Sequence, residues 1–152
     1  MLNKQQAMIA IHPYLNFAGN TEEAFRFYQS VFGGKFSTVS RFRDTAEASR
    51  LPHEEQDKLM HIALPVGRNT VLMATDALES MGHHLNAGNN FSLQIEAEST
   101  EEADALYRAL CEGGKPTLPM MTMFWGTYFG MLTDKFGIQW MINYNFNQSI
   151  SI

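Results

Sequence analysis

"TEEAFRFYQSVFGGK", residues 21–35, returns in altered form as "TEEADALYRALCEGGK", residues 100–115, and this pair decides the fold. Both copies place apolar side chains at helical spacing and end in two glycines, which can adopt the positive φ that closes a helix. The apolar positions are Ala24, Phe27, Tyr28, Val31 and Phe32 in the first copy and Ala103, Leu106, Tyr107, Leu110 and Cys111 in the second. A chain that repeats one helix in this way is expected to consist of two similar modules.

The two helices are also predicted to begin alike. Asn20 is followed by Glu23 at the spacing of a helix N-cap and a carboxylate that bonds back to it. Ser99 and Glu102 repeat that spacing in the second copy.

Strand patterns surround each helix. An alternating strand precedes each one, at residues 11–17 and 90–97, and further strand candidates follow at 35–42, 58–66, 70–76, 115–119, 127–134 and 137–145. Each half therefore reads as strand, helix and three strands. The predicted fold class is α+β, with two βαβββ modules, residues 8–75 and 89–146, inside a single domain that spans residues 1–152. Because one such module leaves a sheet face uncovered, we expect the two to curve into a partly open mixed sheet or barrel around a cavity.

Composition limits the classes of function. The chain has 152 residues, of which 45% are apolar and 18% charged, as in globular proteins. A net charge of −5 without a basic stripe argues against nucleic acid as a partner. No secretory signal and no long apolar run occur, so we expect a cytoplasmic protein with no membrane partner.

Three further features of the sequence are a single cysteine, a long polar connection and a histidine pair. The single Cys111 lies on the helix stripe, which favours a small buried hydrophobe over a nucleophile. Residues 43–57 are long and polar for a connection between strands, which predicts a mobile flap or disorder. The pair His83–His84 belongs to the segment that joins the modules, and a solvated linker is the simpler interpretation, with metal binding as the alternative.

Two stretches, "PYLNFAGNTEEAFRFYQSVFGG" (13–34) and "FWGTYFGMLTDKFGIQWMIN" (124–143), resemble the PhnB-like branch of the vicinal oxygen chelate superfamily. That superfamily includes glyoxalase I, extradiol dioxygenases and bleomycin-resistance proteins, and the resemblance covers roughly residues 12–146. It implies paired βαβββ modules around a cavity and a homodimer.

The resemblance also implies where a metal ion would bind. In metal-using members, ligands come from the first strand of each module and a carboxylate comes from the last. The corresponding positions here are His12, Met73, Asn90 and Met141. The thioethers of Met73 and Met141 cannot replace a carboxylate as ligands of a hard or borderline cation. We therefore expect that the protein binds no metal cofactor. In the alternative, His12 is a ligand of Zn, Ni, Mn or Fe.

Strand alternation predicts the pocket side chains, because successive residues point to opposite faces. The apolar sets, such as Leu15 with Phe17 and Trp140 with Ile142, should pack under the helices. The opposite sets should line the cavity as ligand-binding residues: His12, Tyr14, His61, Met73, Asn90, Ser92, Gln94, Gln139 and Met141. The alternative is that these side chains are exposed to solvent, or that they form hydrogen bonds with one another in a core that has no cavity.

Several of these residues allow more than one role. His12 and His61 can be structural, can act as acid or base, or can form a two-histidine metal site. The methionines near Phe124 and Trp125 fit an adaptable apolar wall better than a Cu(I) site. Trp125 is the predicted stacking surface for a flat ligand.

Three functions compete on this pattern. The first is a metal-independent protein that binds a small aromatic or amphipathic molecule. The second is a divalent-metal-dependent lyase, isomerase or dioxygenase in which His12 is a ligand. Methyl transfer is discounted, because no glycine-rich turn after a strand suggests a site for S-adenosylmethionine.

Overall fold

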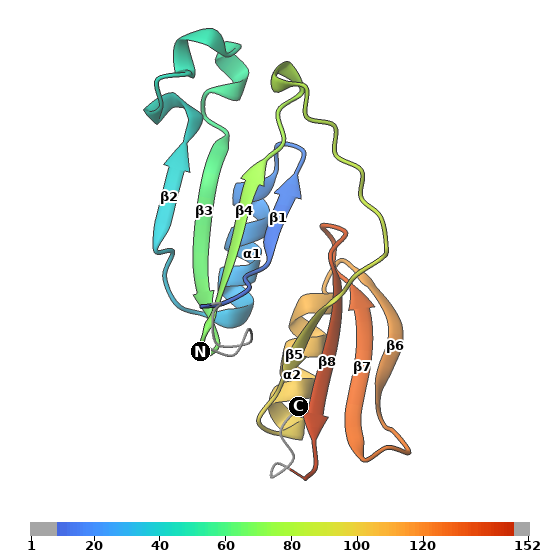
Figure 1. Ribbon diagram of the computed structural model, residues 1–152. Coiled ribbons are helices and arrows are strands. Elements are labelled where there is room, and N and C mark those ends of the chain that lie inside the picture. Colours follow the sequence, from blue (N-terminus) through green and yellow to red (C-terminus); the bar gives the residue numbers. More distant parts are fainter. Residues whose placement is uncertain (1–8, 148–152) are drawn as a thin grey trace, which may run out of the picture. The chain divides into compact units, whose positions relative to one another are not determined.

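The computed structural model describes residues 9–147, which divide into two compact units between Asn86 and Ala87 (Figure 1). The first unit contains β1 (Tyr14–Phe17), α1 (Thr21–Phe32), β2 (Thr38–Arg41), β3 (Leu59–Val66) and β4 (Thr70–Asp76). The second contains β5 (Leu93–Glu96), α2 (Thr100–Cys111), β6 (Lys115–Thr122), β7 (Thr127–Thr133) and β8 (Gln139–Asn145). Both units are βαβββ modules, which confirms the predicted α+β fold.

The two modules share one topology. Their four-stranded sheets have the strand orders β1-β4-β3-β2 and β5-β8-β7-β6. The first strand of each module pairs in parallel with the last, and the other pairs are antiparallel. Both sheets are therefore mixed, and neither closes into a barrel. Within residues 9–147, no helix has both the length and the apolar character needed to cross a membrane.

Helix α1 covers one face of the first sheet (Figure 1). The side chains buried on this face and on the helix are Leu15, Phe17, Ala24, Phe25, Tyr28, Ile62, Leu64, Leu72 and Ala74. The predicted helix stripe omits Phe25, which is fully buried. Thr21, Phe25 and Tyr28 are spaced by about one helical turn, so the buried face is wider than the predicted stripe.

Helix α2 buries Ala103 and Leu110 over the second sheet, where Leu132, Trp140 and Ile142 lie on the covered face. The indole Nε1 of Trp140 donates to Oδ2 of the buried Asp134 at 2.8 Å. Oδ1 of the same carboxylate accepts from the backbone N–H groups of Phe136 and Ile138. Asp134 thus stabilises the turn between β7 and β8 and positions the largest apolar side chain on that face.

The two helices begin differently, contrary to the prediction. Asn20 makes no side-chain bond to α1. The buried carboxylate of Asp76, at the end of β4, accepts instead from the backbone N–H of Thr21 at 3.1 Å and from its hydroxyl at 2.6 Å. Oδ2 of Asp76 accepts from the backbone N–H of Leu59 at 2.8 Å. One carboxylate therefore joins the helix start to β3 and β4, and a local cap is not needed.

Helix α2 keeps the predicted N-cap, since the hydroxyl of Ser99 accepts from the backbone N–H of Glu102 at 3.0 Å. The carboxylate of Glu102 accepts from the backbone N–H of Glu98, one residue before the cap. The prediction for Ser99 is confirmed, and the predicted return bond to the cap residue is displaced by one position.

Residues 43–57, predicted to be a mobile flap or disordered, contain short 3₁₀ helices at Ala48–Arg50 and His53–Glu55, and another begins just before them at Phe42–Asp44. The amide of Gln56 donates to the carbonyls of Ala48 and Leu51. This side chain satisfies backbone acceptors that a strand ladder would otherwise satisfy. Local turns and one glutamine thus give the segment short regular structure, and its mobility stays a prediction.

Candidate functional site

Each sheet has a second face, opposite its helix, which we call the open face. In the first module, Tyr14 pairs with Met73, and Met73 pairs with Ala63. These side chains point away from the face that carries Leu15 and Ala74, because residues alternate along a strand. His61 lies two residues before Ala63 on β3 and shares the open face. The structure thus brings the predicted residues Tyr14, His61 and Met73 together.

Tyr14 and His61 form a pair on this face. The Tyr14 hydroxyl lies 2.9 Å from Nδ1 of His61, and the two rings stack with centroids 5.6 Å apart. Burial raises the pKa of Tyr14, so its hydroxyl keeps its proton at neutral pH. The hydroxyl can therefore donate to Nδ1, which leaves the proton of the neutral imidazole on Nε2.

His12 lies just before β1 and is held differently. Its Nδ1 accepts from the backbone N–H of Val71 at 3.0 Å. This bond continues the β1–β4 pairing beyond Pro13, whose carbonyl accepts from the N–H of Met73. β1 begins at Tyr14, later than the predicted residue 11, because the His12 side chain takes the place of the backbone acceptor there.

The open face of the second module carries more polar groups. Gln94 pairs with Met141, and Met141 pairs with Met131. Gln139 lies two residues before Met141 and shares this face. These residues point away from Trp140 and Ile142, which α2 covers. The predicted residues Gln94, Gln139 and Met141 therefore lie on one side of one sheet.

Glu96 also lies on this open face and was missed by the sequence reasoning. Its Oε1 accepts from the side-chain amide of Gln94, and its Oε2 accepts from Nδ2 of Asn143 at 2.9 Å. Asn143 is 7% exposed and pairs with Glu96 across the strands. The signal was available, because Glu96 continues the alternation that already contained Ser92 and Gln94.

Asn90 and Ser92 precede β5, which begins at Leu93 and not at the predicted residue 90. Both are exposed. The partner strand β8 starts only at Gln139, so residues before Leu93 have no backbone ladder to join. The Gln139 amide donates to the carbonyl of Phe91 and provides one side-chain bond in its place.

Trp125 lies in the turn between β6 and β7 and is 54% exposed. Its ring packs edge-on against Phe124, with centroids 4.9 Å apart, and against Phe129, with centroids 6.1 Å apart. Phe129 lies on the open face, because it pairs with Asn143. The predicted stacking surface is therefore accessible and adjoins the polar groups of the second sheet.

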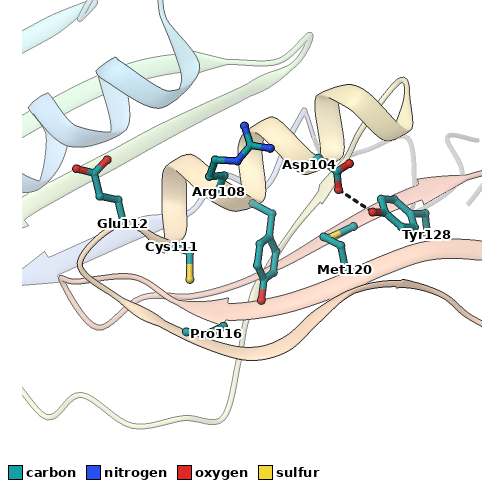
Figure 2. A pocket seen from close by; sticks show the side chains of 8 residues that line it. Asp104, Arg108, Cys111, Glu112, Pro116, Met120 and Tyr128 are labelled. Atoms are coloured by element: carbon teal, nitrogen blue, oxygen red, sulfur yellow. Dashed lines mark hydrogen bonds between the residues drawn. The ribbon is translucent and has the colours of Figure 1, made fainter.

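A groove of about 660 Å³ runs along the other side of the second module, between α2 and the strands beneath it (Figure 2). It is lined by Asp104, Tyr107, Arg108, Cys111, Glu112, Pro116, Met120 and Tyr128. None of the predicted site residues lines it. The pairing of β6 beside it is irregular, since its register with β7 shifts on both sides of Leu118.

The polar groups of this groove are largely engaged in the fold. The Tyr107 hydroxyl lies 3.0 Å from the carbonyl oxygen of Leu118 and 3.1 Å from that of Met131. The Tyr128 hydroxyl donates to Asp104 at 2.7 Å, and this bond raises the pKa of Tyr128 (Figure 2). Cys111 is half-buried, and burial raises the pKa of its thiol, which disfavours a thiolate nucleophile. The groove therefore offers structural contacts and no activated group.

Two of these methionines lie on opposite faces of the second sheet. Met120 lines the groove on the side of α2, whereas Met131 lies on the open face of the same sheet. A Cu(I) site that contains both is excluded by this arrangement.

Comparison with known proteins shows the family to which the chain is similar. Residues 9–143 match the family described as 3-demethylubiquinone-9 3-methyltransferase. The chain is 30% identical over 141 residues to Protein YjdN of Escherichia coli (strain K12), and the match covers 88% of this chain and 93% of that protein.

Solved structures share the fold. The crystal structure of protein PA1353 from Pseudomonas aeruginosa has a TM-score of 0.79 and 36% identity, and the match covers 91% of this chain and 98% of that one. A putative 3-demethylubiquinone-9 3-methyltransferase, PhnB protein, from Bacillus cereus has a TM-score of 0.71 and 24% identity, over 88% of this chain and 98% of that one.

Proposed function

Because this chain belongs to the family described as 3-demethylubiquinone-9 3-methyltransferase, in the PhnB-like branch of the glyoxalase and bleomycin-resistance superfamily, we propose that it binds a small aromatic or amphipathic molecule on its open sheet faces without the superfamily metal. The observation that carries the proposal is the sorting of side chains between the two faces of each sheet. Leu15, Phe17, Trp140 and Ile142 lie under the helices, whereas Tyr14, His61, Gln94 and Gln139 lie on the open faces beside Met73 and Met141. An apolar wall with a few fixed polar groups is what small-molecule recognition requires.

The four positions implied for a metal ion do not fit one. Nδ1 of His12 already accepts from the N–H of Val71, so the proton of the neutral ring lies on Nε2, which then has no lone pair for a metal. Met73 and Met141 are thioethers, and Asn90 is exposed before β5. Among residues 9–147, no three His, Cys, Asp or Glu side chains gather as a ligand set. The donor chemistry therefore supports binding without a metal.

Methyl transfer, which the family description names, is not part of the proposal. In both modules the segment between the first strand and the helix, residues 18–20 and 97–99, contains at most one glycine. A glycine-rich turn at that place is the usual cradle for a nucleotide-like cofactor.

The metal proposal predicts the outcome of a titration. Protein purified without a His-tag and titrated with Zn²⁺, Ni²⁺, Mn²⁺ and Fe²⁺ in a calorimeter is expected to show no stoichiometric site. His12→Ala should give the same traces as the control His53→Ala, since His53 is exposed at the start of a short 3₁₀ helix. Stoichiometric binding that disappears in His12→Ala alone would overturn the metal-free assignment and favour a metal-dependent lyase, isomerase or dioxygenase.

The ligand proposal predicts a fluorescence change from one of the two tryptophans. Trp140 is 4% exposed beneath α2, whereas Trp125 is 54% exposed, so an aromatic ligand should alter the emission of Trp125. Trp125→Phe should abolish the change while it keeps a ring for stacking, and Trp125→Ala should also weaken binding about fivefold, as expected for one lost aromatic contact. An emission spectrum that no compound of a broad aromatic library alters would contradict the role of Trp125.

A further inference from the structure

The carboxylate of Glu96 is oriented but not neutralised. Gln94 and Asn143 each donate an amide N–H to one of its two oxygens. Asn143 is more than nine-tenths buried, so its amide is a fixed part of the sheet. Among the residues that the structure describes, no Lys or Arg forms an ion pair with Glu96. An exposed negative charge is therefore held in one position on the open face.

An aromatic surface lies in the same row of the sheet. Glu96 pairs with Asn143, and Asn143 pairs with Phe129, so the three side chains stand on neighbouring strands and on one face. The outer two are separated by two strand spacings, or roughly 10 Å between Cα atoms. Trp125 packs on Phe129 and leaves about half of its surface exposed. The ring of Phe129 and the carboxylate of Glu96 thus lie within the length of one small molecule, and Trp125 enlarges the aromatic surface beside Phe129.

One further group on this face lacks a partner. The hydroxyl of Thr127 is buried and forms no hydrogen bond with any described residue. Thr127 shares the face of Phe129, since Tyr128 between them points to α2 and bonds to Asp104. A buried hydroxyl without a partner is costly, and the protein itself covers this one.

From these observations we infer that the open face of the second module binds a flat organic cation, whose ring stacks on the aromatic surface of Phe129 and Trp125 and whose ammonium, amidinium or guanidinium group pairs with Glu96. The inference rests on the proposed function and adds the charge of the ligand to it. A carboxylate that accepts from neutral amides keeps its charge for a ligand, and a cation beside an aromatic face gains a second attraction. The net charge of −5 raises the local concentration of cations further.

The test uses three ligands that share a ring and differ in charge: 1-naphthylmethylamine, 1-naphthalenemethanol and 1-naphthylacetate. Calorimetric titration of the full chain should rank them in that order of affinity. Glu96→Gln should weaken the amine about fivefold and leave the alcohol unchanged, as expected for one partly exposed ion pair. Added salt should weaken the amine with the wild-type chain and have little effect with Glu96→Gln.

Glu101→Gln is the matched control, because it removes the same charge from an exposed position on α2 of the same module. It should leave all three affinities unchanged. If the amine and the alcohol bind equally, or if Glu96→Gln has no more effect than Glu101→Gln, the inference is wrong while ligand binding stands. If none of the three ligands binds, both the inference and the proposed function fail. A thermal unfolding curve of Glu96→Gln shows whether a lost affinity reflects lost structure.

Discussion

Asp76→Ala is expected to lower the free energy of unfolding by about 3–5 kcal/mol, because it removes a buried acceptor of three hydrogen bonds. The substitution leaves the N–H and hydroxyl of Thr21 and the N–H of Leu59 buried without partners, and both residues are almost fully inaccessible. It also removes a negative group from the start of α1, where the helix dipole favours one. The measurement is the midpoint and slope of chemical unfolding, followed by circular dichroism.

Asp57→Ala is the control for this change. Asp57 lies in the same module, is exposed, and pairs only at the surface with Arg43. Its loss should change the free energy of unfolding by less than about 1 kcal/mol. Equal stability of the two variants would show that the Asp76 carboxylate does not fasten the helix to the sheet.

Gly114→Ala is expected to destabilise the second module by about 3 kcal/mol. A Cβ atom at this position would overlap the carbonyl oxygen of Thr133 and lie 2.9 Å from the Cα of Asp134. Both neighbours are backbone atoms next to the buried carboxylate that holds Trp140, so neither can move without distorting the turn between β7 and β8. For a chain of this size the expected fall in melting temperature is roughly 6–12 °C.

Gly88→Ala is the matched substitution, because a Cβ there meets no atom within 4 Å and the backbone has no positive φ. It should leave the melting temperature within about 1 °C of the wild type or raise it slightly, since alanine reduces the freedom of the unfolded chain. If Gly114→Ala and Gly88→Ala have the same melting temperature, the contact between the added Cβ and the backbone of Thr133 and Asp134 is relieved without cost.

The repeat predicted most of the fold because it combines two local signals. Helical spacing of apolar residues and paired glycines predicted both helices to within a few residues, and alternation predicted the faces of β1, β3 and β8. These signals depend only on neighbours along the chain. The open-face positions of Tyr14, His61, Gln94 and Gln139 followed from the same alternation.

The features that the sequence did not reveal depend on distant partners. Nothing beside Asp76 in the chain indicates that it caps a helix 55 residues earlier. The contact of His12 with Val71 requires knowledge of the parallel register of β1 and β4. Glu96 is a different case, because it continues the alternation of Ser92 and Gln94 and needs no knowledge of a distant partner.

The outer edge of β6 has a consequence for association. A strand that ends a sheet offers unpaired N–H and carbonyl groups on which another chain can add a strand, the first step toward fibrillar aggregation. Pro116 and Pro119 lack a backbone N–H, so β6 has fewer donors for pairing, and the register shifts around Leu118 bend it away from a flat template. The longest free strand edge of the second module is thus a poor seed for intermolecular β-pairing, and replacing both prolines with valine would restore that hazard.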